Sequence, residues 1–127
     1  YVTKKKYDKI LLDLPCSSSG TIRKNPDIKW RLDINEIKRI QDVQYRILDN
    51  MKNQIALGGE IIYSTCSIFN DENEYNIIKF LNKNKNFNIS NIKEMVPLKF
   101  INKLGGMTIL PDDDYEGMFA IKLIKNA

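Results

Sequence analysis

The feature that most constrains this sequence is an alternation of short apolar runs with an amphipathic stretch near its start. Tyr7–Asp13 is an apolar run that ends at Leu14 and Pro15, which is typical of a buried strand. After a loop, apolar residues recur on one face of a long predicted helix, at Ile37, Ile40, Ile47, Leu48, Met51 and Ile55. A second strand, residues 60–65, follows. This order predicts a βαβ unit with two parallel, neighbouring strands.

Local signals predict where the helices begin and end. Asp33 and Glu36 form a capping box for the long helix, and the glycine pair at 58–59 is expected to end it. Asp71 and Glu74 are expected to cap a second helix. Its apolar face carries Ile77, Ile78 and Leu81.

The rest of the chain predicts a closing part of the same sheet. Phe87–Ile92 is a further strand candidate. Met107–Leu110 and Met118–Lys125 are expected to form an antiparallel pair around the turn-rich segment Pro111–Gly117. Because no repeat or linker occurs, the sequence predicts one α/β domain over residues 1–127.

Composition excludes several kinds of chemistry. The 127 residues include no histidine and only two cysteines, fifty positions apart, so a metal site and Ser-His or Cys-His catalysis are not expected. The formal net charge of +4 suits a polyanionic partner without demonstrating one. No apolar run approaches the roughly 20 residues that cross a bilayer, and no signal peptide opens the chain, so we expect a cytoplasmic protein.

The two cysteines follow the two predicted parallel strands. Cys16 comes after the first strand and Cys66 directly after the second. Parallel neighbours lie about 4.8 Å apart, and α/β folds build their sites at the carboxyl ends of such strands. We therefore expect the two thiols to lie within about a nanometre of each other at that edge.

The residues around these cysteines carry a family resemblance. Asp13-Leu-Pro-Cys16 and Ser64-Thr-Cys66-Ser67 resemble the D-x-P-C and T-C motifs of the Sun-type (Nop/Sun) RNA cytosine-C5 methyltransferases. The resemblance continues through 23–30, 44–48, 58–59, 72–74 and 116–122, and is greatest to the small-subunit ribosomal RNA branch. Glu116 and Met118 stand where that family more often has Asp and Phe, a conservative difference.

The resemblance implies a fold, a reaction and site residues. The fold would be the second half of a Rossmann-like class I methyltransferase sheet, with parallel strands and an antiparallel terminal hairpin. The reaction would be methylation of C5 of a cytidine in RNA, with S-adenosyl-L-methionine as methyl donor and 5-methylcytosine as product. The resemblance assigns the nucleophile to Cys66, which would attack C6, and the helper in product release to Cys16. Asp13 would contact the cytosine edge and border the cofactor.

One departure concerns the cofactor. No G-x-G-x-G loop occurs among only six glycines, and in this family that loop lies on earlier strands. We therefore expect the chain to be the carboxyl-terminal half of a longer enzyme and to be inactive alone. Its first strand would expose an unpaired edge, so we also expect self-association.

Several residues keep two interpretations. Arg23, Lys24 and Lys29, in the loop after Cys16, are expected either to contact RNA or to be solvated. Trp30 is more often core than a stacking platform, and Glu72 with Glu74 would favour the dipole at a helix start. Three other functions remain open: a non-catalytic RNA-binding fragment, a DNA-type cytosine methyltransferase with Cys16 as nucleophile, and a thiol redox protein.

Overall fold

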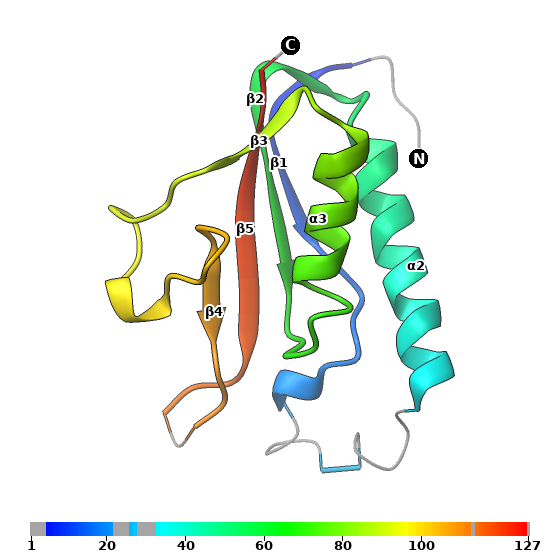
Figure 1. Cartoon of the computed structure of the whole chain (residues 1–127), viewed down its shortest axis with the longest axis vertical. Helices are drawn as coiled ribbons and strands as arrows, with labels where there is room; N and C mark the ends of the chain where they lie inside the picture. The colour runs from blue at the N-terminus through cyan, green and yellow to red at the C-terminus, as the bar shows by residue number, and fades with distance from the viewer. Residues whose placement is uncertain (1–4, 22–25, 28–32, 113, 127) are drawn as a thin grey trace.

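A computed structural model describes residues 5–21, 26–27, 33–112 and 114–126. Within these residues the chain forms one five-stranded sheet with two α-helices and two short 3₁₀ helices (Figure 1). In chain order the elements are β1 (Tyr7–Asp13), η1 (Ser19–Thr21), α2 (Ile34–Met51), β2 (Ile55–Thr65), α3 (Glu74–Lys83), β3 (Phe87–Ser90), η2 (Leu98–Phe100), β4 (Met107–Ile109) and β5 (Met118–Lys125). None of the described helices is long and apolar enough to cross a membrane.

The predicted βαβ unit is confirmed. β1 and β2 are adjacent and parallel, with Leu11 opposite Ile62 and Asp13 opposite Ser64. α2 connects the two strands and lies with α3 over one face of the sheet (Figure 1). Both strands therefore end at the same edge, where η1 also lies.

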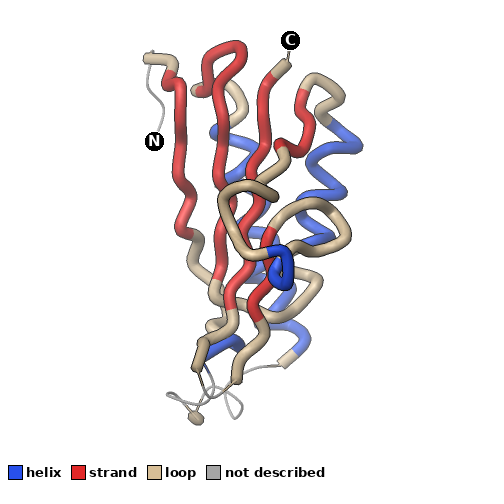
Figure 2. Tube along the Cα trace, turned by 90° about the vertical axis from the view of Figure 1, so that its left-hand side faces the viewer, coloured by secondary structure: helices blue, strands red, loops and turns tan. Residues whose placement is uncertain are grey.

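The second part of the sheet is antiparallel, as the sequence predicted. β5 pairs with β2, with Thr65 opposite Phe119, and the strand order is β1-β2-β5-β3. β3 and β4 both pair with β5, β3 with residues 122–125 and β4 with residues 118–120. Figure 2 shows the strands side by side, with the helices behind them.

The long helix begins where the sequence predicted and ends earlier. The Asp33 side chain accepts a hydrogen bond from the backbone N of Glu36 over 2.8 Å, which caps α2. The predicted end at the glycine pair 58–59 is wrong, because α2 ends at Met51 and Ile55 already belongs to β2. The glycine pair lies inside β2, at a bulge where Gly58 has a φ of +80°. Ile55 fits the helical spacing, yet its side chain is buried in the core beneath the sheet.

The second helix also differs at its start. The N-cap of α3 is Asn73, whose side chain makes no capping hydrogen bond, so the predicted cap by Asp71 and Glu74 is wrong. Ile77 is fully buried, whereas Ile78 is 43% exposed and lies outside the buried face. The core lies between the helices and the sheet, and its buried members include Leu48, Ile61, Tyr63, Ile77, Phe80, Phe119, Ile121 and Leu123.

Candidate active site

The two cysteines meet at the edge where β1 and β2 end. Cys16 Sγ lies 2.8 Å from Cys66 Sγ, and both side chains are half-buried. The expectation that the two thiols lie within about a nanometre of each other is confirmed, and their separation is longer than the roughly 2.05 Å of a disulfide bond. Both cysteines are free thiols, so the contact is a hydrogen bond between sulfur atoms.

Two glycines allow three loops to converge on this contact. The backbone N of Gly20 donates to the carbonyl of Cys66 over 2.8 Å, and the backbone N of Gly117 donates to the carbonyl of Gly20 over 2.8 Å. A Cβ on Gly20 would lie 2.5 Å from the Gly117 carbonyl oxygen, and one on Gly117 would lie 2.7 Å from Gly20 Cα. The segment before β5 is therefore held directly against the loop that carries Cys16.

A buried carboxylate connects the two cysteine loops. Each cysteine is followed by a serine, and both serines donate to Glu72, which is fully buried. Ser17 donates its backbone N to Glu72 Oε1 over 2.7 Å and its hydroxyl to Oε2 over 2.6 Å, and the Ser67 hydroxyl also donates to Oε2. The interpretation of Glu72 as a dipole-favouring residue at a helix start is wrong, because its side chain points into this network. The repeated Cys-Ser pair was the available sequence signal.

Gln44 and Asn73 connect the two cysteine loops to the helical segments. Gln44, on α2, donates to the Pro15 carbonyl over 2.9 Å and to Glu72 over 3.1 Å. Asn73 accepts from the Thr65 hydroxyl over 2.6 Å and donates to the Ser67 carbonyl over 2.9 Å. The cysteine loops are thus fixed by hydrogen bonds to both helical segments.

The pKa values of the two thiols differ in opposite directions from that of an ordinary cysteine. Donation from the Cys16 thiol is the largest cause that lowers the pKa of Cys66, to about 6; burial opposes it, and the Ser18 hydroxyl assists. The Cys66 sulfur and burial together raise the pKa of Cys16 far above its ordinary range. At neutral pH the site therefore holds a Cys66 thiolate beside a protonated Cys16, which is a nucleophile with an adjacent proton carrier.

Of the other predicted site residues, the structure describes Asp13 but not the basic residues of the loop after Cys16. Asp13 is exposed at the end of β1, the strand that leads to Cys16. Arg23, Lys24 and Lys29 lie outside the described residues, as does Trp30.

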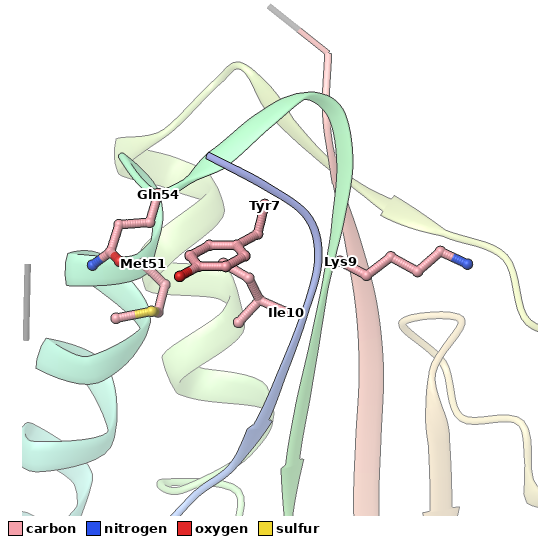
Figure 3. A pocket seen from close by; sticks show the side chains of 5 residues that line it. All are labelled: Tyr7, Lys9, Ile10, Met51 and Gln54. Carbon is pink, nitrogen blue, oxygen red and sulfur yellow. The ribbon is translucent and has the colours of Figure 1, made fainter. Parts of the chain in front are cut away.

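A separate hollow lies at the opposite end of β1. Figure 3 shows Tyr7, Ile10, Met51 and Gln54 gathered between the start of β1 and the end of α2, with Lys9 pointing away. Its volume is about 260 Å³ and its lining is mainly apolar. It contains no cysteine or carboxylate, so it offers no nucleophile or acid–base group comparable to the cysteine pair.

The family model and the named relatives that this chain matches agree on one family. Residues 1–124 match the family described as 16S rRNA methyltransferase RsmB/F. Ribosomal RNA small subunit methyltransferase B of Pectobacterium atrosepticum is 36% identical over 121 residues, which are 94% of this chain and 27% of that protein. The protein of the same name from Yersinia enterocolitica is 34% identical over 119 residues, 94% of this chain and 26% of that protein. The chain thus spans about a quarter of the length of these relatives.

Solved structures agree with the fold. The crystal structure of NSun6 from Pyrococcus horikoshii with SFG matches with a TM-score of 0.82 and 26% identity, over 98% of this chain and 32% of that one. The crystal structure of PH0851 matches with a TM-score of 0.83 and 39% identity, over 93% of this chain and 26% of that one. The predicted Rossmann-like α/β fold, parallel strands followed by antiparallel ones, is confirmed.

Proposed function

Because the chain belongs to the RsmB/F family of 16S rRNA methyltransferases, we propose that it is the carboxyl-terminal part of an S-adenosylmethionine-dependent RNA methyltransferase that modifies C5 of a cytidine. We propose cytoplasmic small-subunit ribosomal RNA as the substrate, on the strength of the relatives' names. The observation that carries the chemistry is the 2.8 Å contact between Cys16 and Cys66 at the carboxyl ends of β1 and β2.

The two thiols suit the two halves of this reaction. C5 of cytosine is a weak nucleophile, and addition of the Cys66 thiolate to C6 makes it an enamine carbon. S-adenosylmethionine, when bound, supplies an electrophilic methyl group. After C5 has accepted the methyl, loss of the C5 proton to a base and cleavage of the Cys66–C6 bond restore the aromatic ring and the thiolate. We assign assistance in this release to Cys16, whose thiol lies beside the nucleophile.

The remaining contacts are assigned by position. Asp13 is proposed to contact the cytosine edge and to border the cofactor, since its exposed carboxylate suits the positive charge of a sulfonium and amino group. Arg23, Lys24 and Lys29 are proposed to contact RNA phosphates, because they follow the loop that carries Cys16. The glycine-rich part of the cofactor site is proposed to lie in the preceding half of the enzyme. A related structure was crystallised with SFG, an analogue of S-adenosylmethionine, which supports the choice of donor.

The test is the fate of the covalent RNA adduct in the enzyme that includes the preceding half of the sheet. Cys66→Ala should abolish both methylation and any covalent RNA link. Cys16→Ala should still permit addition and methyl transfer, so methylated RNA should stay attached through Cys66. The expected band survives denaturing electrophoresis, grows with added S-adenosylmethionine, and is absent in the double variant.

Each rival function has its own outcome in this experiment. A trapped adduct in Cys66→Ala instead of Cys16→Ala would assign the nucleophile to Cys16, as in DNA-type enzymes. RNA binding without methyl incorporation or adduct would indicate a non-catalytic RNA-binding fragment.

The short separation of the sulfurs also favours a thiol redox protein as a second candidate. In that case the two thiols would lose two protons and two electrons to glutathione disulfide, giving one disulfide and two reduced glutathiones. Absence of an intramolecular disulfide after equilibration with a glutathione buffer in the cytosolic range would remove this candidate.

A further inference from the structure

Ser18 has a backbone conformation that serine rarely adopts. Its φ is +58°, and among the described residues it is the one position other than glycine with positive φ. This left-handed region is occupied by glycine at little cost, because a Cβ crowds the neighbouring backbone there. Ser18 lies between Cys16 and Gly20, where glycine would satisfy the turn without strain. The side chain therefore needs an explanation that the backbone does not provide.

The three consecutive serines of this loop contact different groups. Ser17 donates its hydroxyl to Glu72, and Ser19 accepts from the backbone N of Ile68 over 2.9 Å. Ser18 is the one whose hydroxyl contacts the sulfurs, with Oγ 3.4 Å from Cys66 Sγ and 3.8 Å from Cys16 Sγ. The Ser18 carbonyl accepts from both the backbone N and the hydroxyl of Thr21 over 2.8 Å. This holds the strained turn in place.

The direction of the Ser18–Cys66 hydrogen bond depends on the proton of the thiol. While Cys66 is protonated, its thiol donates to Ser18 Oγ. Once that proton leaves, only the hydroxyl of the pair still carries a hydrogen. A serine hydroxyl rotates freely about its Cβ–Oγ bond, so it can turn and donate to the thiolate. Hydrogen bonds to an ionised acceptor are the stronger kind, so this contact favours the charged sulfur.

We propose that Ser18 is a further catalytic residue, whose hydroxyl stabilises the Cys66 thiolate before attack and again when the sulfur leaves C6. This inference rests on the proposed function for its chemistry and on the loop geometry for its contact. Strained backbone is typical of functional sites, where the surrounding structure supports it. The Cys16 thiol and the backbone of Cys66 also favour the thiolate, whereas burial and the Asp13 carboxylate oppose it. Variants of Ser18 retain all of these groups.

The experiment separates the hydroxyl from the strain by using two substitutions. Ser18→Ala removes the hydroxyl and keeps the Cβ, whereas Ser18→Gly removes both. Ser19→Ala is the matched control, because it alters the same loop at a buried hydroxyl that contacts Ser67 and Ile68 instead of the sulfurs. For each variant of the chain, the rate of iodoacetamide labelling at Cys66 is measured from pH 4.5 to 9, and stability is measured by urea unfolding.

We expect Ser18→Gly to combine a smaller thiolate fraction at Cys66 with greater stability than Ser18→Ala. The labelling midpoint should rise by about half to one pH unit in both Ser18 variants, which at pH 6 lowers the thiolate fraction about two- to fivefold. Ser18→Gly should unfold at a higher urea concentration than Ser18→Ala, because the strain is relieved. Ser19→Ala should unfold at a lower urea concentration than the native chain, and its labelling midpoint should stay unchanged.

An unchanged midpoint in both Ser18 variants would overturn the proposal, as would an equal shift in Ser19→Ala. Labelling requires no methyl transfer, so this result is independent of whether the adduct experiment on the parent enzyme succeeds.

Discussion

Replacing Cys16 by alanine removes the donor nearest to the Cys66 sulfur, and the pH dependence of Cys66 alkylation should report the loss. In the native protein the two Sγ atoms lie 2.8 Å apart, and this contact is the largest cause of the low pKa of Cys66, about 6. An ordinary cysteine has a pKa of about 8.5. The alanine variant should therefore move toward that value, with Ser18 still opposing the full change.

The magnitude follows from the thiolate fraction and from intrinsic reactivity. At pH 6 a thiol with a pKa of about 6 is half ionised, whereas one at 8.5 is about 0.3% ionised, a difference of about 160-fold. The more basic thiolate is intrinsically more reactive, by about 13-fold for a Brønsted slope near 0.45. Alkylation at pH 6 should thus fall by up to about tenfold. At pH 8 and above, where most of the native thiol is already ionised, the variant should match or exceed the native rate.

The assay uses short iodoacetamide pulses followed by trypsin and mass spectrometry, since Cys16 and Cys66 fall in separate peptides, residues 10–23 and 53–79. Cys16→Ser is the matched control, because it keeps a donor at the same place and should give an intermediate midpoint. A midpoint near 6 that does not change in Cys16→Ala would refute the assignment of Cys16 as the donor.

Three further predictions concern the hydrogen bonds and packing around the thiols and the edge of the sheet at β1. Glu72→Gln should lower the free energy of unfolding by about 2–3 kcal/mol, since an amide cannot accept all four hydrogen bonds. Glu36→Gln, at an exposed i,i+3 pair, should change the free energy of unfolding far less in the same urea titration. Gly117→Ala should destabilise by about 1–3 kcal/mol and slow labelling of Cys66, because its Cβ would overlap Gly20. Light scattering should show self-association through the edge of β1, decreased in Leu11→Lys; a monomer at high concentration would contradict this.

The sequence predicted the part of the fold that depends on alternation and on short-range signals. The parallel pair, the antiparallel closing strands and the Asp33 cap follow from apolar spacing and from one side-chain hydrogen bond. The meeting of Cys16 and Cys66 follows from topology alone, since neighbouring parallel strands end at one edge. Their 2.8 Å contact does not, because it depends on loops whose geometry is set by Gly20 and Gly117.

The errors arose where tertiary contacts outweighed local preference. Ile55 continues the helical spacing of α2, but burial in the sheet places it in β2 and leaves Gly58 and Gly59 at a bulge. Glu72 is an acidic residue of the kind typical near the start of a helix. The serines after both cysteines nevertheless direct its carboxylate inward. Both features depend on pairs of residues far apart in sequence, which local patterns do not report.

The contact between the thiols also bears on the order of proton transfers in the proposed reaction. Cys16 has a raised pKa because its thiol donates to the Cys66 sulfur, because it is partly buried, and because the charge on Cys66 opposes a second ionisation. The first and the last of these causes depend on Cys66 being a free thiolate. Once Cys66 is bonded to C6 of the cytosine, its sulfur is neutral and a much weaker acceptor, so the pKa of Cys16 should fall. Cys16 would then lose its own proton to water more readily, and the resulting thiolate could accept the C5 proton, directly or through water, only after the adduct has formed. When the Cys66–C6 bond breaks, the returning charge would favour proton retention on Cys16 again. Such a pair would keep Cys16 protonated until the adduct has formed. Labelling of Cys16 tests this directly: it should stay slow in the native protein at pH 8, and become faster in Cys66→Ala, where no thiolate faces it.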